Sequence, residues 1–439
     1  MAGESCRSKL GDYFTLQRGT TYKSRLLGQP GPVLLGLATI QRNGGFRTDS
    51  LQTYGGDSPV KLLVQPGDLY LSLKDVTQSA DLLGAVARLP ISQSLGRLTQ
   101  DTVRLEPREN DVPLNYLYWL LRTPQYRSYC RAHATGTTNL GLAREDFLAF
   151  PAPEPTPTQC QMVDTLSTLD DKIELNRRMN ETLEAIARAL FKSWFVDFDP
   201  VRAKAEGRWR RGESLPGLPA HLWNLFPDSF EDSELGEIPK GWGIARFGDI
   251  VKHLRDQKNP LSSPNTLFHH FSIPAFDEGQ TPKLEYGENI KSIKSHVPAG
   301  VILLSKLNPE IERVWFADVG SADRAVCSTE FLVLHARSPF TRSYVYCLAR
   351  SSLYRQLIEG LVTGTSKSHQ RAQVDSILSI AVVIPPSPIV VMFDRAAEGL
   401  LARTFRCRRE SCTLAALRDT LLPRLISGEV RIEAAEKAV

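Results

Sequence analysis

Two short polar loops offer hydroxyl and backbone N–H groups at corresponding places in the two halves of the chain. Residues 135–139 are Thr-Gly-Thr-Thr-Asn, and residues 363–368 are Thr-Gly-Thr-Ser-Lys-Ser. Because Gly136 and Gly364 have no Cβ, a ligand oxygen can approach the backbone closely there. Hydroxyls and backbone amides are donors that hold phosphate oxygens. The pattern indicates either phosphate-contacting loops or structural turns before a last strand.

Cationic side chains accompany these loops. Lys74 and Lys306 each follow a β-like segment ending in Leu-Ser, and they match when the halves are compared. We expect a lysine there to contact a phosphate rather than a base. Of the other basic loop residues, we expect only some to make contact. The candidate contacts are Arg42, Arg47, Lys74, Thr135, Gly136, Thr137, Thr138, Arg255, Lys258, Lys306, Thr363, Gly364, Thr365 and Lys367.

The sequence contains no recognisable catalytic or metal-binding motif. It has no G-x-x-x-x-G-K-[ST], G-x-S-x-G, H-E-x-x-H or G-x-G-x-x-G pattern. The seven cysteines are scattered without a Cys-x-x-Cys pair, and the eight histidines have no carboxylate or cysteine at ligand spacing. We therefore predict no catalytic residue and no metal site, and a protein that binds rather than catalyses.

The composition is that of an ordinary soluble protein. Of 439 residues, 42% are hydrophobic and 23% are charged, and the formal net charge is +4. This mild positive charge permits a polyanionic partner without requiring one. The polar N-terminus and the lack of a long apolar run argue against secretion and membrane insertion. Together with the scattered cysteines, this predicts a cytoplasmic protein.

Apolar residues recur at steps of four and three from Met162 to Trp194, which is the spacing of a coiled-coil seam. Asn176 and Asn180 place amides in this seam, where a partner helix must satisfy them and where they would set the register. A second stripe with the same steps, Phe393–Leu421, supplies the partner helix. The predicted helix-pairing seam is Leu166, Leu169, Ile173, Asn176, Asn180, Leu183, Leu190, Phe393, Leu400, Cys407, Leu414, Leu417 and Leu421.

The two halves of the chain are related by an internal repeat. Six blocks recur in one order at a separation of about 230 residues, among them SKLGDYFTLQ and ARFGDIVKHL, QPGDLYLSLK and PAGVILLSK, and TQDTVRLEP and STEFLVLHA. The short β-like segments and amphipathic helices within each half predict a mixed α/β (α+β) domain. We therefore predict two tandem domains and two long helices that pair antiparallel within the chain.

This arrangement suits a target that is itself split into two parts, as protein symmetry suits half-sites on DNA. A rigid scaffold for two protein partners, without any nucleic-acid role, would show the same repeat and the same helices. A self-contained methyltransferase is disfavoured because the catalytic motifs are missing.

Specific segments resemble one known family. SWFVDFDPVRAKAEG after the first long helix, DSELGEIPKGW before the second half, the Thr-Gly-Thr loops, and LRDTLLPRLISGEV near the end are similar to the specificity (S) subunit of Type I restriction-modification systems. The resemblance covers essentially the whole chain. One departure is that the first half lacks an equivalent of Ile238–Trp242, which raises the question of how the first domain is anchored.

The resemblance implies a division into segments and a function. It implies a first target recognition domain at 1–157, a central spacer helix at 158–199, a linker at 200–236, a second target recognition domain at 237–385, a C-terminal spacer helix at 386–427 and a tail at 428–439. It implies a non-catalytic subunit that reads one half of a bipartite, asymmetric DNA site with each domain. It also implies two methyltransferase (M) subunits docked on the helices and restriction (R) subunits joined to them. S-adenosylmethionine, ATP and Mg²⁺ are expected on those partner chains.

Overall fold

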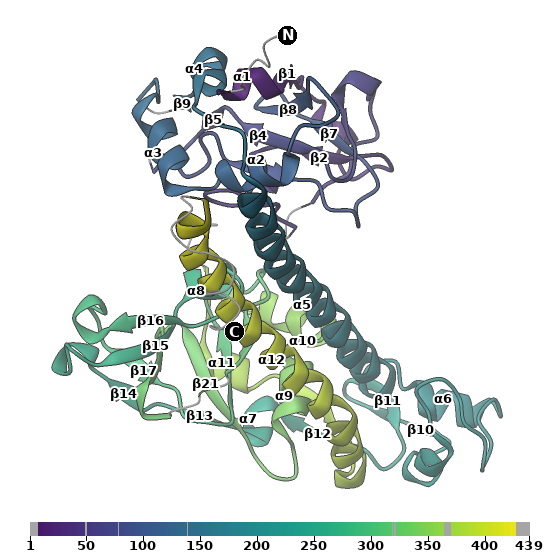
Figure 1. Cartoon of the computed structure of the whole chain (residues 1–439). Coiled ribbons are helices and arrows are strands. Elements are labelled where there is room, and N and C mark those ends of the chain that lie inside the picture. The colour runs from purple at the N-terminus through teal and green to yellow at the C-terminus, as the bar shows by residue number, and fades with distance from the viewer. Residues whose placement is uncertain are drawn as a thin grey trace, which may run out of the picture. The chain divides into compact units, whose positions relative to one another are not determined.

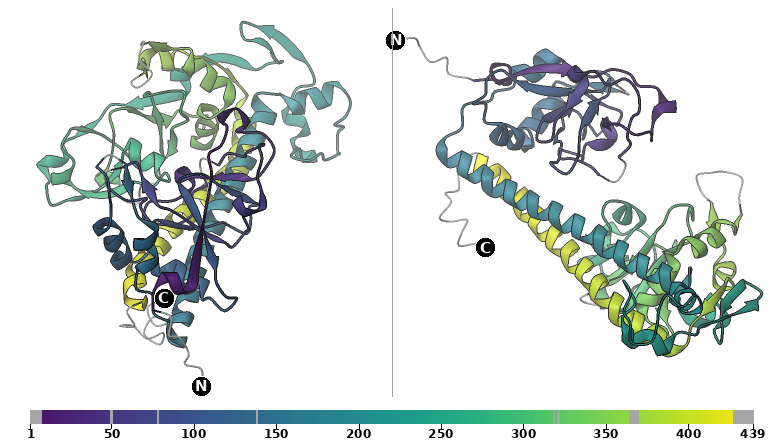
Figure 2. Two further views of the ribbon diagram at one scale, coloured as in Figure 1. Left: turned by 90° about the horizontal axis from the view of Figure 1, so that it is seen from above. Right: turned by 90° about the vertical axis from the view of Figure 1, so that its right-hand side faces the viewer.

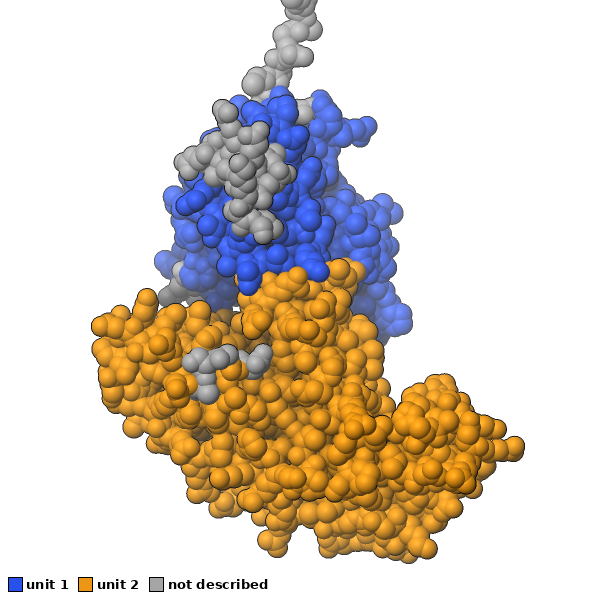
Figure 3. Space-filling model, turned by 60° about the horizontal axis from the view of Figure 1, so that its bottom comes forward, with its two compact units in different colours: residues 1–173, 413–439 blue, residues 174–412 orange. Residues whose placement is uncertain are grey.

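The computed structural model describes residues 8–48, 51–77, 79–137, 139–317, 319, 322–363 and 370–426 (Figure 1). The chain divides into two compact units, residues 1–173 with 413–439 and residues 174–412 (Figure 3). The long helices α5 (Pro157–Phe195) and α12 (Ser387–Ile426) each contribute residues to both units. The Thr138 and Gly364–His369 positions lie outside the described residues.

The first unit is built on a four-stranded antiparallel sheet in the order β1-β8-β4-β6. Its strands are β1 (Phe14–Arg18), β4 (Leu69–Ser72), β6 (Val86–Arg88) and β8 (Thr102–Pro107). A second sheet has the order β2-β7-β3, and a short pair joins β5 to β9. These strands are β2 (Val33–Leu35), β3 (Leu63–Val64), β5 (Lys74–Asp75), β7 (Gly96–Leu98) and β9 (Leu140–Gly141).

Short helices cover the first sheet and enclose an apolar core. They are α1 (Leu10–Tyr13), α2 (Leu114–Leu120), α3 (Pro124–Ala132) and α4 (Arg144–Ala149), with 3-10 turns η1 (Ser24–Leu26), η2 (Leu37–Thr39) and η3 (Val60–Leu62). Trp119 and Tyr126 are fully buried there. Leu166 of α5 and Leu422 of α12 belong to the same core, so both long helices pack on this domain.

The second unit repeats the four-stranded sheet of the first unit strand by strand. Its four-stranded antiparallel sheet has the order β13-β21-β18-β19, which is the order of the first unit. The strands are β13 (Val251–Leu254), β18 (Val301–Ser305), β19 (Val314–Phe316) and β21 (Phe331–Ala336). The corresponding helices are α7 (Phe247–Ile250), α9 (Arg342–Ala349), α10 (Ser352–Glu359) and α11 (Val374–Leu378).

The helix caps repeat as well. Thr123 caps α3 by accepting a hydrogen bond from the Tyr126 N–H, and Ser351 caps α10 by accepting one from Tyr354. The predicted internal duplication and the two-domain α/β class are therefore confirmed.

The second sheet is larger in the second unit. It has five strands in the order β14-β17-β20-β15-β16, where the first unit has three. They are β14 (Gln257–Lys258), β15 (Leu267–Phe271), β16 (Lys283–Tyr286), β17 (Lys294–His296) and β20 (Ala325–Cys327). The unit also contains β22 (Val362–Thr363) with β23 (Arg371–Ala372), β12 (Gly243–Arg246) with β24 (Ala381–Ile384), α8 (Ile273–Asp277), η5 (Pro260–Ser262), η6 (Gly287–Asn289) and η7 (Ala322–Arg324).

The β12–β24 ladder shows how the first domain is closed without an Ile238–Trp242 equivalent. In the second unit this ladder ends at Arg246 opposite Ala381. In the first unit the corresponding contact is a single antiparallel bridge between Lys9 and Pro151. The first domain is therefore closed by a shortened form of the same pairing.

Residues 200–236 differ from the predicted surface linker. They contribute to α6 (Asp199–Ala205), η4 (Ala220–Leu225), β10 (Phe230–Ser233) and β11 (Gly236–Pro239). Trp209, Leu222 and Phe226 are buried in the core of the second unit. These residues follow neither helical nor strand periodicity, because proline and glycine turns separate them, so tertiary packing rather than pattern buries them. α5 ends at Phe195 instead of residue 199, and the chain turns at Phe198, whose φ is 55°.

The two long helices run antiparallel within each unit. In the first unit, Asp170 of α5 forms an ion pair with Arg418 of α12. In the second unit, Asn176 contacts Glu410, and the Phe191 ring lies 5.6 Å from the Phe393 ring. The ribbons of α5 and α12 run side by side in this unit (Figure 2). Residue numbers fall on α12 as they rise on α5, so the predicted antiparallel pairing is confirmed.

Truncating the aromatic cluster at the end of α5 should destabilise the second unit. Phe191 is buried, with its ring 5.4 Å from Tyr344 and 5.6 Å from Phe393. We expect Phe191→Ala to lower the unfolding free energy by about 3–5 kcal/mol in urea denaturation, through lost burial and a cavity. Ile186→Ala, on the exposed face of the same helix, should cost about 0.5 kcal/mol or less. Equal effects of the two changes would contradict this packing.

Candidate functional site

The Thr-Gly-Thr loop of the first unit is held against β9. The Thr135 N–H donates to the Gly141 carbonyl at 2.9 Å, and the Gly141 N–H donates back at 2.8 Å. Gly141 in turn pairs with Lys74. Gly136 has a φ of 96°, and a Cβ there would lie 2.5 Å from the Asn139 carbonyl oxygen, so the turn requires glycine. Sequence-predicted candidates Lys74, Thr135, Gly136 and Thr137 therefore lie in one place.

A cleft of about 320 Å³ opens beside this loop. It is lined by Leu37, Lys74, Asp75, Val76, Gln100, Asp101, Asn139, Leu140 and Gly141. The Lys74 amine lies 3.1 Å from the Asp101 carboxylate. The cleft is thus lined by a cation, two carboxylate residues and two amide residues together with apolar residues.

The second unit has the same arrangement at the Thr363 loop. Thr363 pairs with Arg371 in β22–β23, and Leu307 forms a bridge to Arg371. Of the sequence candidates here, Gly364, Thr365 and Lys367 lie outside the described residues, as does the side chain of Thr363.

The structure corrects the match between Lys74 and Lys306. In the first unit the Ser72 hydroxyl accepts a hydrogen bond from the Lys74 N–H, and in the second unit the Ser305 hydroxyl accepts one from Leu307. The structural counterpart of Lys74 is therefore Leu307, one residue after Lys306. Sequence comparison shifted the two lysines by one position because both follow a Leu-Ser pair, and such a shift along an extended chain reverses the side-chain face.

The remaining sequence candidates lie elsewhere on the two units. Arg42 and Arg47 are exposed around a turn closed by a backbone bridge between Ile40 and Phe46. The Lys258 amine donates to the Asp323 carbonyl.

Arg255 and Lys306 both act electrostatically on His253. Partial burial of the ring lowers the pKa of His253, and the charges of Arg255 and Lys306 lower it further. Both cations thus influence one histidine although they are far apart in the sequence, and the Asp375 carboxylate opposes them.

Sequence reasoning missed the Arg371–Glu330 pair. The Arg371 Nε and Nη2 atoms donate to the two Glu330 carboxylate oxygens at 3.1 and 2.9 Å. This bidentate contact raises the pKa of Arg371. The sequence did contain a signal for the acid of this pair. The repeated blocks TQDTVRLEP and STEFLVLHA place Asp101 and Glu330 at the same position, immediately before β8 and β21.

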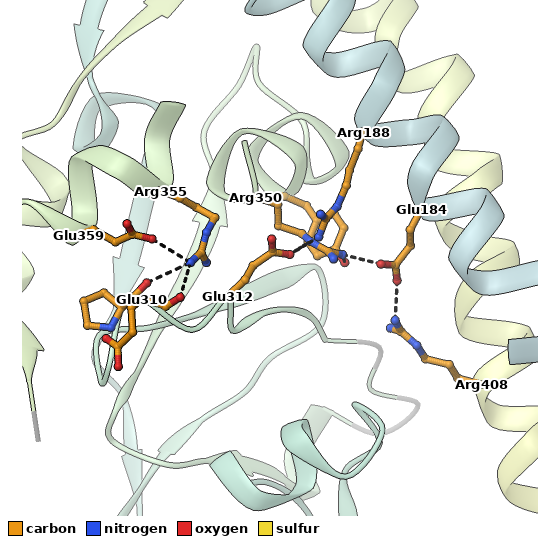
Figure 4. A network of polar contacts seen from close by, with 10 residues as sticks. Glu184, Arg188, Glu310, Glu312, Arg350, Arg355, Glu359 and Arg408 are labelled. Atoms are coloured by element: carbon orange, nitrogen blue, oxygen red, sulfur yellow. Dashed lines mark hydrogen bonds and ion pairs between the residues drawn. The ribbon is translucent and has the colours of Figure 1, made fainter. Parts of the chain in front are cut away.

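A charged network joins the two long helices to the second domain (Figure 4). The Glu184 carboxylate of α5 accepts hydrogen bonds from Arg350 at 2.8 Å and from Arg408 of α12. Glu312 accepts from Arg350 and from Arg188 of α5. Burial favours the neutral form of Glu184, but Arg350 and Arg408 outweigh it and lower the pKa of Glu184.

Asn176 of α5 also forms a hydrogen bond with a residue of α12. Its side chain is fully buried, and its Nδ2 donates to Glu410 at 2.9 Å. Among the other predicted seam residues, Leu166, Phe393 and Cys407 are buried. Those that are half-buried are Leu169, Ile173, Asn180, Leu183, Leu190, Leu400, Leu414, Leu417 and Leu421.

At some positions of the two long helices, the most buried residue is the neighbour of the predicted seam residue. Phe191, Leu401 and Leu422 are more buried than the predicted Leu190, Leu400 and Leu421. The helix ends contact a domain as well as the other helix, and this widens and rotates the buried face.

Comparison with known proteins places these features in a family context. No protein-family model matches the chain. It is 26% identical over 365 residues to the Type I restriction enzyme MjaIX specificity subunit of Methanocaldococcus jannaschii, covering 80% of this chain and 75% of that relative. It is 28% identical over 386 residues to the Type I restriction enzyme HindI specificity subunit of Haemophilus influenzae, covering 74% of this chain and 79% of that relative.

This chain is a homologue of Type I restriction enzyme specificity subunits. The crystal structure of the S subunit of a Type I restriction-modification system from M. genitalium shares its fold, with a TM-score of 0.56, 13% identity and 97% of both chains covered. The resemblance that the sequence motifs indicated is therefore confirmed over most of the chain. The relatives are named as specificity subunits, which is the class of subunit that the sequence motifs predicted.

Two further observations concern the described part of the chain. No helix there is both long and apolar enough to span a membrane. Nor do three or more histidine, cysteine, aspartate or glutamate side chains gather there as metal ligands would.

Removing the Glu184 carboxylate should loosen the helix–domain junction. We expect Glu184→Gln to lower the unfolding free energy at pH 7 by about 3–5 kcal/mol, because Arg350 and Arg408 lose their shared partner. Because the pKa of Glu184 is lowered in the folded chain, its contribution exists above the unfolded value near 4.3 and disappears as the pH falls through the folded value.

Urea denaturation at pH 7 and in acid measures this effect. Glu181→Gln is the matched control, because Glu181 pairs with Arg177 on its own helix and is largely exposed. The same loss of stability in both variants would contradict a bridging role for Glu184.

Proposed function

We propose that this chain is the DNA sequence-recognition subunit of a Type I restriction-modification complex. In this proposal it binds a bipartite, asymmetric DNA site with one domain on each half-site. The observation that carries the proposal is the combination of homology to specificity subunits with the repeated four-stranded sheet of the two domains.

The two domains share a scaffold but differ in their polar surfaces. The four-stranded sheets have the same strand order, while the loops beside them carry different residues. Exposed loop residues vary without disturbing a core, so one scaffold can present two different sets of side chains. This supports recognition of two unlike half-sites. The candidate contacts Lys74, Thr135 and Thr137 lie beside the cleft of the first domain, and Arg255 and Lys306 of the second domain both act electrostatically on His253.

The partners follow from the same proposal. Two methyltransferase subunits dock on the outward faces of the long helices, where Leu175 and Ile186 of α5 expose apolar surface. Restriction subunits join through them. S-adenosylmethionine, ATP and Mg²⁺ are bound by these partner chains, and the complex acts in the cytoplasm.

Deleting the gene should remove one methylation pattern from the host genome. If the chain directs an adenine methyltransferase, methylome sequencing will show the loss of a single bipartite N6-methyladenine motif. Complementation with the intact gene should restore that motif. An unchanged methylome in a strain whose partner methyltransferase is expressed would favour a protein-interaction scaffold instead.

Exchanging one domain should change half of the recognised sequence. We expect replacement of residues 243–384 by those of a relative to change one half-site and leave the other intact. These bounds include both strands of the β12–β24 ladder, so that the pairing which closes the domain is exchanged as a unit. The methylated motif of the chimaera provides the measurement. A change in both half-sites would contradict one domain per half-site.

A further inference from the structure

In both domains a carboxylate holds an exposed cation at the same place. Asp101 immediately precedes Thr102, which lies opposite Ser72 in the first sheet. Glu330 immediately precedes Phe331, which lies opposite Ser305 in the second sheet. The acid therefore occupies one structural position in both units.

The cation that pairs with this acid comes from a different strand in each domain. In the first domain it is Lys74 of β5, whose partner is Gly141. In the second domain it is Arg371 of β23, whose partner is Leu307. Gly141 and Arg371 occupy equivalent positions, and so do Lys74 and Leu307. The cation therefore lies on one strand in the first domain and on the facing strand in the second, whereas the acid occupies the same position in both.

The exposure of the two pairs is also alike. The side chains of Lys74 and Arg371 are 50% and 51% exposed, whereas those of Asp101 and Glu330 are 25% and 21% exposed. In each domain the side chain of the cation is thus about half exposed, and the more recessed acid restrains its charged end. This restraint reduces the side-chain entropy lost on binding.

Such a pair is poorly suited to a phosphate. Its charges cancel, so it contributes little to the counterion release that drives phosphate contacts. It is well suited to the major-groove edge of a G·C base pair, which presents the acceptors O6 and N7 on guanine beside the N4 amino donor on cytosine. Arginine and lysine donate to the first two atoms, and a carboxylate accepts from the third.

We propose that Arg371 and Glu330 together read a G·C base pair in the half-site bound by the second domain. Lys74 and Asp101 are the counterpart in the first domain. There the adjoining cleft of about 320 Å³ also presents Gln100 and Asn139. This gives Lys74 a base-reading role instead of the phosphate contact expected from sequence. The inference rests on the proposed function and names the residues that determine its specificity.

A charge-neutral double variant tests the pair. Arg371→Ala combined with Glu330→Ala removes both members without changing the net charge. Binding of the variant, assembled with its methyltransferase subunits, is measured on the wild-type DNA site and on a set with each base pair replaced in turn. We expect discrimination at one G·C pair of one half-site to fall roughly 10- to 100-fold. Preferences in the other half-site should stay unchanged.

Salt dependence separates base reading from phosphate contact. If the pair reads a base, the slope of log affinity against log salt on the wild-type site stays the same in the variant. A uniform loss of affinity on all sequences, with a slope smaller by about one, identifies Arg371 as a phosphate contact and overturns the inference. Unaltered preference at every position shows a structural ion pair and also overturns it.

Three controls complete the design. Lys74→Ala with Asp101→Ala should relax one G·C pair in the opposite half-site. Lys240→Ala, at an exposed lysine before the second domain, should change no preference. If the Arg371 double variant does not assemble, Arg371→Lys is tested in its place, because it keeps the charge but loses the planar fork of the guanidinium group. The guanine preference should still weaken in this variant. An unchanged preference overturns the inference.

The experiment distinguishes the two levels of the proposal. A wild-type complex without sequence-specific binding contradicts the proposed function itself. A wild-type complex that recognises a bipartite site, with variants whose base preferences are unaltered, contradicts only the role of the acid–cation pairs.

Discussion

The polar contacts between the two long helices are the constraint on which the rest of the fold depends. Glu184 of α5 lies between Arg408 of α12 and Arg350 of the second domain, so one carboxylate joins three elements. A buried ion pair of this kind adds little net stability, because desolvation offsets the attraction. It does disfavour other alignments, since a slip of the helices would leave an arginine or a carboxylate buried without a partner. Asn176 with Glu410 and Asp170 with Arg418 extend the same constraint along the helices.

Each domain is attached to the helices by side chains at equivalent positions. Arg122 at the end of α2 binds Asp170 of α5 and also contacts the hydroxyl of Tyr118. Arg350 at the end of α9 binds Glu184 and also contacts the hydroxyl of Tyr346. The duplication has therefore preserved the attachment along with the sheet. Guanidinium groups suit this role because their fork of donors can satisfy several acceptors at once.

The two domains diverge where backbone constraints are weakest. Buried strands keep their order because each must satisfy its ladder and the core beneath it. The β5–β9 and β22–β23 pairs are only two residues long in each strand and lie beside loops. The half-exposed side chains on them, Lys74 and Arg371, can change without a packing cost. The exchange of the cation from Lys74 to Arg371 is an example of such a change. A recessed acid in a constant position then restrains whichever cation is present.

The sequence by itself determined the duplication, the α/β class, the two long helices and their antiparallel pairing. These features follow from hydrophobic periodicity and ordered repeats, which are local properties of the chain. Only the tertiary structure showed that Trp209 and Phe226 are buried, and that Lys74 corresponds to Leu307 rather than Lys306. It alone paired Arg371 with Glu330, and Glu184 with Arg350. These contacts join residues 41 and 166 positions apart, and no periodic signal in the sequence encodes a contact at such a separation.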